Sequence, residues 1–295
     1  MRTVYYSPSY TASGYTFDTS RKAGWVADSL LAQPIAGLQL RPPPDLSQSL
    51  LTQVHDPAYV RAIEIGQPVA LAESQGFRWD AGLWPMVLAS NGGAVAAALT
   101  ALEQRVAGSL SSGLHHARRK TGIGFCTFNG LALAAQAALD AGGAGSVLIL
   151  DLDAHCGGGT HSLIAGDERI WQVDVAVNSF DSYQPTERTS LDLVRGADDY
   201  LPTIERRLAG LDQAPRFDLC LYNAGMDPYE RCDLGGLAGI TLERLAAREA
   251  MVFDWCARRD VAIAFVLVGG YLGDELDQAG LVEAHRLTLS AAAAR

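Results

Sequence analysis

Runs of apolar residues alternate along the chain with longer segments that have helical patterning. The runs predict strands at residues 3–6, 147–150, 170–177, 219–222 and 262–268. Between and after them, the pattern predicts helices at residues 20–31, 85–104, 129–141, 200–208, 241–259 and 276–293. Apolar strands that alternate with helices about every 30 residues are typical of a mostly parallel sheet with helices on both faces.

Several segments between these elements lack such patterning and are expected to be loops. Three prolines predict a loop at residues 41–45, because proline cannot continue a helix. Residues 178–198 and the glycine-rich residues 233–240 are also expected to be loops. Asp80 and Trp84 are expected in an ordinary surface loop rather than at a pocket rim. No internal repeat, low-complexity linker or shift in composition interrupts the chain, so we expect one domain spanning residues 1–295.

Polar side chains with metal-binding chemistry follow the apolar run at 147–150. Asp151, Asp153 and His155 are spaced by two, and three glycines follow at 157–159. If the backbone stays extended, residues spaced by two point to the same side. Converging buried charges need a cation or a paired charge, because unpaired buried charge is costly. The alternative is an ordinary loop whose aspartate caps a helix.

Residues that could take part in metal binding or catalysis also follow two further predicted strands. Asp227 follows the run at 219–222, and Gly269-Gly270-Tyr271 follows the run at 262–268. Ligands of open α/β sheets bind outside the carboxyl ends of the strands. Asp153, His155 and Asp227 would give a metal three ligands and leave a fourth position for water, which is typical of catalytic zinc. This oxygen-rich set would also accept iron or manganese.

The neighbouring histidines 115 and 116 suit proton transfer near neutral pH. Tyr271 has a hydroxyl that could donate a hydrogen bond to a reacting carbonyl oxygen. Asp174 interrupts the apolar pattern of residues 170–177, so it is expected to face the site or a second cation. His55 is expected to have a structural hydrogen-bonding role.

Composition limits the partners. The formal net charge is −10, which argues against a sequence-independent grip on nucleic acid. The N-terminus lacks the pattern of a signal peptide, and no apolar run approaches the ~20 residues of a membrane span. Five cysteines without the spacing of a structural zinc site suggest reduced thiols. We therefore expect a cytoplasmic protein that binds neither nucleic acid nor membrane.

Five motifs together resemble the zinc-dependent histone deacetylase family and its bacterial amidohydrolase relatives. They are GLHHA at 113–117, GFCTFN at 124–129, DLDAHCGGGT at 151–160, NAGMDP at 223–228 and GGY at 269–271. They occur in the family's order over about 160 residues, and HDPAYV at 55–60 is a weaker match. The resemblance implies the arginase–deacetylase fold, a single open, mostly parallel eight-stranded sheet with helices on both faces.

The resemblance also implies roles for individual residues. Zinc would be bound by Asp153, His155 and Asp227. His115 and His116 would be the general base and acid and its electrostatic partner, Asp151 would support His115, and Tyr271 would stabilise the oxyanion. Substrate would lie against Phe125, Gly124 and Gly270, with Phe125 as one wall of a narrow tunnel and Cys126 beside it as a buried thiol. A structural potassium ion near Asp151, Asp153 and backbone carbonyls is a weaker implication.

Two positions depart from the family pattern. Cys156 stands where the family usually has a second histidine, which is not a ligand, so this change is expected to be tolerable. Gly158 stands where the family has Asp or Asn to support the second catalytic histidine. We therefore expect His116 to be less well oriented, unless water or another side chain substitutes. Replacement of Gly158 by Asn or Asp is expected to be tolerated.

Three functions follow from these residues. The first is a zinc-dependent amidohydrolase that removes an acetyl or other acyl group from acetyl-lysine, an acetylpolyamine or another acylated amine. The second is a ureohydrolase of the same fold, although Gly157 stands where its next metal-ligating aspartate should be. The third is a non-catalytic binding or regulatory protein, which the presence of the ligands, both histidines and Tyr271 disfavours. The acyl group, the amine and the oligomeric state stay open.

Overall fold

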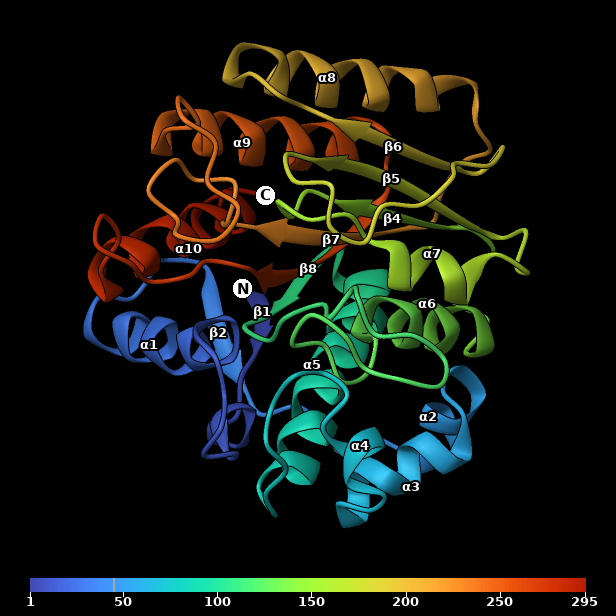
Figure 1. Cartoon of the computed structure of the whole chain (residues 1–295). Coiled ribbons are helices and arrows are strands. Elements are labelled where there is room, and N and C mark those ends of the chain that lie inside the picture. The colour runs from blue at the N-terminus through green and yellow to red at the C-terminus, as the bar shows by residue number, and fades with distance from the viewer. Residues whose placement is uncertain (45) are drawn as a thin grey trace.

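A computed structural model describes residues 1–44 and 46–295, and its centre is one sheet of eight parallel strands (Figure 1). The strand order is β2-β1-β3-β8-β7-β4-β5-β6, and every neighbouring pair is parallel. The strands are β1 (Arg2–Tyr5), β2 (Leu38–Arg41), β3 (Val106–Ser109), β4 (Val147–Asp151), β5 (Ile170–Ala176), β6 (Thr189–Leu193), β7 (Leu219–Gly225) and β8 (Ala262–Val268). The predicted sheet is confirmed.

Helices cover both faces of the sheet, as the apolar strands require (Figure 1). They are α1 (Asp18–Ala32), α2 (Gln48–Val54), α3 (Pro57–Ile65), α4 (Val69–Ala72), α5 (Leu83–Gln104), α6 (Gly130–Asp140), α7 (Gly158–Ile164), α8 (Ala197–Gly210), α9 (Leu242–Arg258) and α10 (Gln278–Ala293), with short 3₁₀ helices at Pro8–Thr11 and Leu211–Gln213. One core lies between the sheet and α1, α8, α9 and α10, and the other lies beneath α5 and α6 with α2 and α3.

The register of the central strands brings the chemically capable strand ends to one edge. Asp151 at the end of β4 is paired with Asn223 of β7 on one side and with Asp174 of β5 on the other. Gly225 at the end of β7 is paired with Val268 at the end of β8. Because all these strands run in the same direction, the loops that follow them meet above the same part of the sheet.

Three strands and one long apolar helix differ from the sequence-based expectations. β6 lies inside the segment expected to be a loop, and neither β2 nor β3 was predicted. β2 and β6 are edge strands of partly exposed residues without a continuous apolar run, and β3 is a short buried strand with the sequence VAGS. By length and composition, α5 reaches the dimensions of a membrane span, although no apolar run that long was expected. It packs on β3 and β8, and over half of its apolar window is buried. Asp45, the last residue of the proline-rich loop, lies outside the described residues.

His55 is a structural residue, as predicted. Its buried ring donates from Nδ1 to the carbonyl of Arg118 at 3.0 Å, and its Nε2 accepts the amide of Asn129 at 3.0 Å. Burial lowers the pKa of His55 to about 4, although the hydrogen bond to Arg118 opposes the shift. The neutral ring therefore joins two loops that lead into the site.

We expect His55 to make stability sensitive to acid. The pKa of an unfolded histidine is about 6.5, so the unfolded chain binds this proton more readily than the folded chain. The contribution is complete above that value and is lost as the pH falls towards 4, with a slope of up to about 1.4 kcal/mol per pH unit. Denaturant unfolding between pH 4 and 7 should show a shallower slope for His55→Gln than for wild type. Equal slopes would contradict this account.

Candidate active site

The three expected metal ligands converge at the ends of β4 and β7. Nδ1 of His155 lies 3.1 Å from Oδ1 of Asp153 and 3.1 Å from Oδ2 of Asp227. One potential ligand atom from each residue lies within 4.8 Å of the others. Within residues 1–44 and 46–295, no other group of three or more His, Cys, Asp or Glu side chains meets this condition. Their donor set and spacing suit one divalent cation.

The electrostatics of these three groups also favour a cation. Burial alone would lower the pKa of His155, but hydrogen bonds to Asp153 and Asp227 raise it to about 10. Burial, followed by the charge of Asp153, raises the pKa of Asp227 to about 6. Two buried carboxylates thus repel each other and gain from any positive charge placed between them.

Glycines at the ends of β7 and β8 allow the close approach of the ligand-bearing segments. A Cβ on Gly225 would lie 2.4 Å from the Cα of Asp153, and a Cβ on Gly269 would lie 2.4 Å from the Cγ of Asp227. Gly269 also has a left-handed φ of 63°. Side chains at these positions would push the two carboxylates apart.

The histidine pair lies beside the metal-binding group. Nδ1 of His115 donates to Oδ2 of Asp151 at 2.7 Å, as expected, and the Nε2 atoms of His115 and His116 are 3.1 Å apart. Burial alone would lower the pKa of His115, but Asp151 and Asp153 raise it to about 10. Burial and then the charge of His115 lower the pKa of His116 to about 4. Near neutral pH, one imidazole is therefore charged and its neighbour is neutral.

The structure supplies the partner that the sequence left unexplained for His116. Nδ1 of His116 lies 3.0 Å from Oδ2 of Asp181, a residue in the loop between β5 and β6 that the sequence analysis did not single out. Another side chain therefore substitutes for the residue missing at position 158, the alternative that the sequence analysis left open, and His116 is oriented by Asp181. The expectation that Gly158 tolerates Asn or Asp is wrong on steric grounds, because a Cβ there would lie 2.2 Å from the carbonyl oxygen of Asp181.

Tyr271 follows the end of β8 and is 9% exposed. Its amide donates to Sγ of Cys232 at 3.1 Å, and the next amide, of Leu272, donates to Oδ2 of Asp18 at 3.0 Å. Burial and then the charge of Asp227 raise the pKa of the Tyr271 hydroxyl well above its usual value. The phenol therefore stays protonated and can act as a hydrogen-bond donor.

Several aromatic rings contact one another and the residues of the site, and the sequence analysis proposed a role in the site only for Phe125. Phe125 has a left-handed φ of 63° and stacks on Phe17 at 4.6 Å between ring centroids, with an interplanar angle of 9°. Phe77 stacks on Phe125 at 5.3 Å. The ring of Phe17 also lies 5.8 Å from that of Tyr271, so the N-terminal segment reaches the site. Phe180 contacts His116 edge-on at 5.0 Å.

The two glycines expected to line the substrate have different surroundings. A Cβ on Gly124 would lie 2.6 Å from Cδ2 of His116, so this residue lies directly against a candidate catalytic ring. A Cβ on Gly270 would lie 2.3 Å from a methyl group of Leu281 on α10, so the closest contact is with the core. Contact with substrate stays a prediction for both residues.

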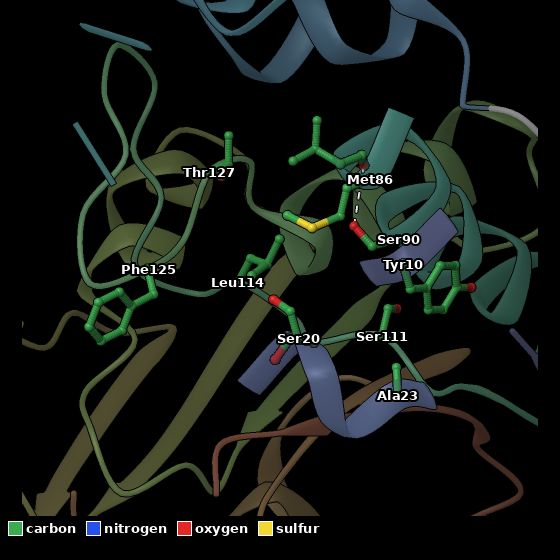
Figure 2. A pocket seen from close by; sticks show the side chains of 11 residues that line it. Tyr10, Ser20, Ala23, Met86, Ser90, Ser111, Leu114, Phe125 and Thr127 are labelled. Atoms are coloured by element: carbon green, nitrogen blue, oxygen red, sulfur yellow. Dashed lines mark hydrogen bonds between the residues drawn. The ribbon is translucent and has the colours of Figure 1, made fainter. Parts of the chain in front are cut away.

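A small internal cavity of about 20 Å³ lies beside the histidine-bearing segment (Figure 2). It is lined by side chains from α1 and α5, together with Leu114, which precedes His115, and Phe125. None of the three expected metal ligands lines it. A cavity of this size can hold about one water molecule.

A buried arginine joins the two ligand-bearing segments from below. Arg248 of α9 is fully buried, and its guanidinium donates to the carbonyl of Gly225 at 2.6 Å and to that of Leu152 at 3.3 Å. Glu249 balances its charge at 2.6 Å. In the sequence, Arg248 and Glu249 look like ordinary charged residues on the surface of a helix. Only the packing of α9 against the sheet shows that they are buried beneath the site.

Asp174 of β5 and the cysteines at 126 and 156 are held by contacts with neighbouring backbone or by burial. Oδ2 of Asp174 accepts the amide of Gly157 at 2.7 Å, and no partner is found for its buried Oδ1 among the described residues. Burial, followed by the charge of Asp151, raises the pKa of Asp174 well above its usual value. Cys126 is buried, which raises the pKa of its thiol, as expected of a residue that is not a nucleophile. Sγ of Cys156 donates to the carbonyl of Asn178 at 3.3 Å.

Fold and site together define a deacetylase-type α/β enzyme scaffold, and comparison with known sequences assigns it to a family. The sequence model described as "Histone deacetylase domain" matches residues 19–286, so the chain belongs to the histone deacetylase family. Membership of this family supports hydrolase activity of the deacetylase type.

Individual relatives are more distant. The chain is 34% identical to an uncharacterized protein of Picosynechococcus sp. over 75% of each chain. It is 28% identical to histone deacetylase 2 of Arabidopsis thaliana over 61% of this chain, and this match spans 48% of that relative. The acetylpolyamine aminohydrolase of Burkholderia pseudomallei has the same fold, with a TM-score of 0.80 at 19% identity over 99% of this chain and 98% of that one. The HD domain of HDA15 gives a TM-score of 0.78 at 19% identity over 99% and 90% of the two chains.

Proposed function

We propose that this protein is a zinc-dependent amidohydrolase that removes an acetyl or other acyl group from a linear amine. The observation that carries the proposal is the convergence of Asp153, His155 and Asp227 beside two imidazoles whose Nε2 atoms are 3.1 Å apart. A non-catalytic binding protein would have no need for this arrangement. Family membership supports the same reaction class.

The residues divide the reaction between them. A divalent metal held by the three ligands would polarise the amide carbonyl and acidify a water molecule. His116, neutral near pH 7, is placed to accept a proton from the attacking water and to pass it to the leaving amine. His115, held by Asp151, adds positive charge beside it. The Tyr271 hydroxyl donates to the carbonyl oxygen as negative charge develops there.

Zinc is the proposed metal because of the family, since the donor set itself also accepts iron or manganese. The single cluster of ligands within the described residues supports one catalytic metal. Potassium near Asp151 and Asp153 stays a weaker proposal. Both oxygens of Asp151 already accept hydrogen bonds. Among the described residues, Oδ1 of Asp174, Oε1 of Gln172 and Oδ1 of Asn223 are buried oxygens of nearby strands without a hydrogen-bond partner.

The proposed substrates are acyl-lysine peptides and acylated small amines such as acetylpolyamines. A matrix of metal-replete enzyme with acetyl- and longer acyl-lysine peptides, acetylpolyamines and arginine would test the proposal. Release of a carboxylate and a free amine from at least one acyl amine supports it, and an EDTA-treated sample should be inactive. Hydrolysis of arginine alone would favour the ureohydrolase alternative, and inactivity on the whole panel would contradict catalysis.

Tyr271→Phe removes one hydroxyl and leaves the buried ring. We expect kcat to fall by about 100-fold or more, because the donor acts mainly in the transition state. Metal content should stay at the wild-type value, because the structure does not place Tyr271 among the ligands. Tyr229→Phe, at a buried tyrosine outside the proposed machinery, serves as the control. A Tyr271→Phe enzyme that keeps more than half of the wild-type rate would exclude the proposed role.

A further inference from the structure

We propose that Asp181 is the positioning residue of His116, and that the lack of a side chain at Gly158 makes this possible. Oδ2 of Asp181 lies 3.0 Å from Nδ1 of His116 and accepts the amide of Gly159 at 3.0 Å. Its Oδ1 forms an ion pair with the guanidinium of Arg118. With a side chain only 3% exposed, Asp181 is held in one orientation by three donors. This inference rests on the proposed role of His116 in proton transfer.

The side chains of residues 158 and 181 compete for the same space. A Cβ on Gly158 would lie 2.2 Å from the carbonyl oxygen of Asp181 and 2.7 Å from its Oδ1. A carboxylate carried by position 158 and the observed placement of Asp181 therefore exclude each other. The acceptor for His116 comes from the loop between β5 and β6, 65 residues along the chain from the histidine.

The backbone of Asp181 shows that this placement is specific. Its φ is 59°, in the left-handed region that aspartate enters more readily than most residues with a side chain. Arg118 fixes the segment from the other side, because its guanidinium also donates to the carbonyl of Gly158 at 3.3 Å. Several contacts thus hold an otherwise unfavourable conformation.

The same loop also carries an aromatic ring that lies against two histidines of the site. Phe180, the residue before Asp181, is 43% exposed and lies edge-on to the rings of His116 at 5.0 Å and His155 at 6.1 Å. Phe180 and Asp181 are consecutive residues, so one loop segment carries both the aromatic ring beside His116 and the acceptor of its Nδ1 proton.

Asp181→Ala should lower kcat by about 10- to 100-fold, as is typical when the partner of a catalytic-site imidazole is removed. KM should stay within about threefold of wild type, because the substrate-facing walls are unchanged. Asp192→Ala is the matched control, since Asp192 pairs with Arg206 at 3.0 Å on the surface, outside the site. If the alanine variant does not fold, Asp181→Asn keeps an acceptor oxygen of the same reach and should retain part of the activity.

Nuclear magnetic resonance of the metal-replete, ¹⁵N-histidine-labelled protein can detect the hydrogen bond between His116 and Asp181 without a measurement of activity. The His116 Nδ1 proton should give a downfield resonance in wild type and in Asp192→Ala, and it should be lost or shifted upfield in Asp181→Ala. Unchanged resonance and unchanged kcat in Asp181→Ala would overturn the inference. If the wild-type protein hydrolyses no acyl amine but the resonance is still lost in Asp181→Ala, the proposed function is wrong and the contact between Asp181 and His116 is supported.

Gly158→Ala tests the competition for space. We expect it to displace Asp181 and to reproduce the kcat and resonance changes of Asp181→Ala, whereas Gly210→Ala, with no atom within 4 Å of its added Cβ, should behave as wild type. The double variant Gly158→Ala/Asp181→Ala should lose little more kcat than either single variant, because both remove the same contact. Fully multiplicative losses would overturn the link between the two positions.

Discussion

Asp227→Ala and Asp153→Ala should each purify without a stoichiometric divalent metal and without measurable amidohydrolase activity. Each substitution leaves only one carboxylate and one imidazole, and a catalytic zinc site needs three protein ligands. Both carboxylates lie 3.1 Å from the same ring nitrogen, Nδ1 of His155. No other His, Cys, Asp or Glu side chain of the described residues belongs to this group and could take the place of the missing ligand. Metal analysis after dialysis, together with the rate on the best acyl amine, measures both effects.

The control for these variants is Asp192→Ala, whose carboxylate pairs with surface arginines of α8. It should keep a full equivalent of metal and wild-type activity. Asp227→Asn gives a second test that preserves side-chain size, so a failure of Asp227→Ala to fold does not end the experiment. A full equivalent of metal in both alanine variants would rule out the ligand assignment.

His116→Ala should lower kcat/KM by about 10²- to 10⁴-fold, the usual contribution of a positioned acid or base. Burial and the charge of His115 lower the pKa of His116 to about 4, so the ring is neutral and can accept a proton near pH 7. As the pH falls towards that value the ring becomes protonated, and the rate should fall with it. A pH–rate profile of wild type should therefore show an acidic limb that is absent from His116→Ala.

The comparison with His115→Ala distinguishes the role of His115 from that of His116. Asp151 and Asp153 raise the pKa of His115 to about 10 against the effect of burial, so it stays charged through the neutral range. Its removal should lower the rate through lost electrostatic support and should leave the acidic limb in place. Near-wild-type activity of His116→Ala across the pH range would contradict the proposed division of roles.

Much of the scaffold and the metal group follows from local sequence pattern. The apolar runs that become β4, β7 and β8 are buried on both faces of the sheet, and such strands are recognisable because every position must be apolar. Asp153, His155 and Asp227 follow these runs, and parallel strands deliver their carboxyl ends to the same edge. The side chain of Thr241, the first residue of the helix predicted at residues 241–259, accepts the amide of Arg244 and caps α9.

The edge strands, the aromatic stack beside the site and the contacts of Arg248 could be identified only from the tertiary structure. β2 and β6 need apolar residues on fewer positions, because their surroundings are partly solvent, and so they lack a continuous pattern. Phe17 reads as one apolar residue before a helix, and its stacking on Phe125 depends on where α1 packs. The contacts of Arg248 with the carbonyls of Leu152 and Gly225 join segments far apart in the chain.

Gly158 shows most directly where local sequence stops being informative. Because residue 158 is glycine, residues 151–160 lack the side chain that usually supports the second histidine. Nothing in the sequence of this segment indicates which residue replaces it. Asp181 takes the role because parallel pairing of β4 with β5 brings the loop after β5 over the start of α7, where a glycine leaves space for it. The sequence by itself determined which groups are available at the strand ends. Tertiary packing decided which carboxylate meets which imidazole, because that depends on distances between segments that are remote along the chain.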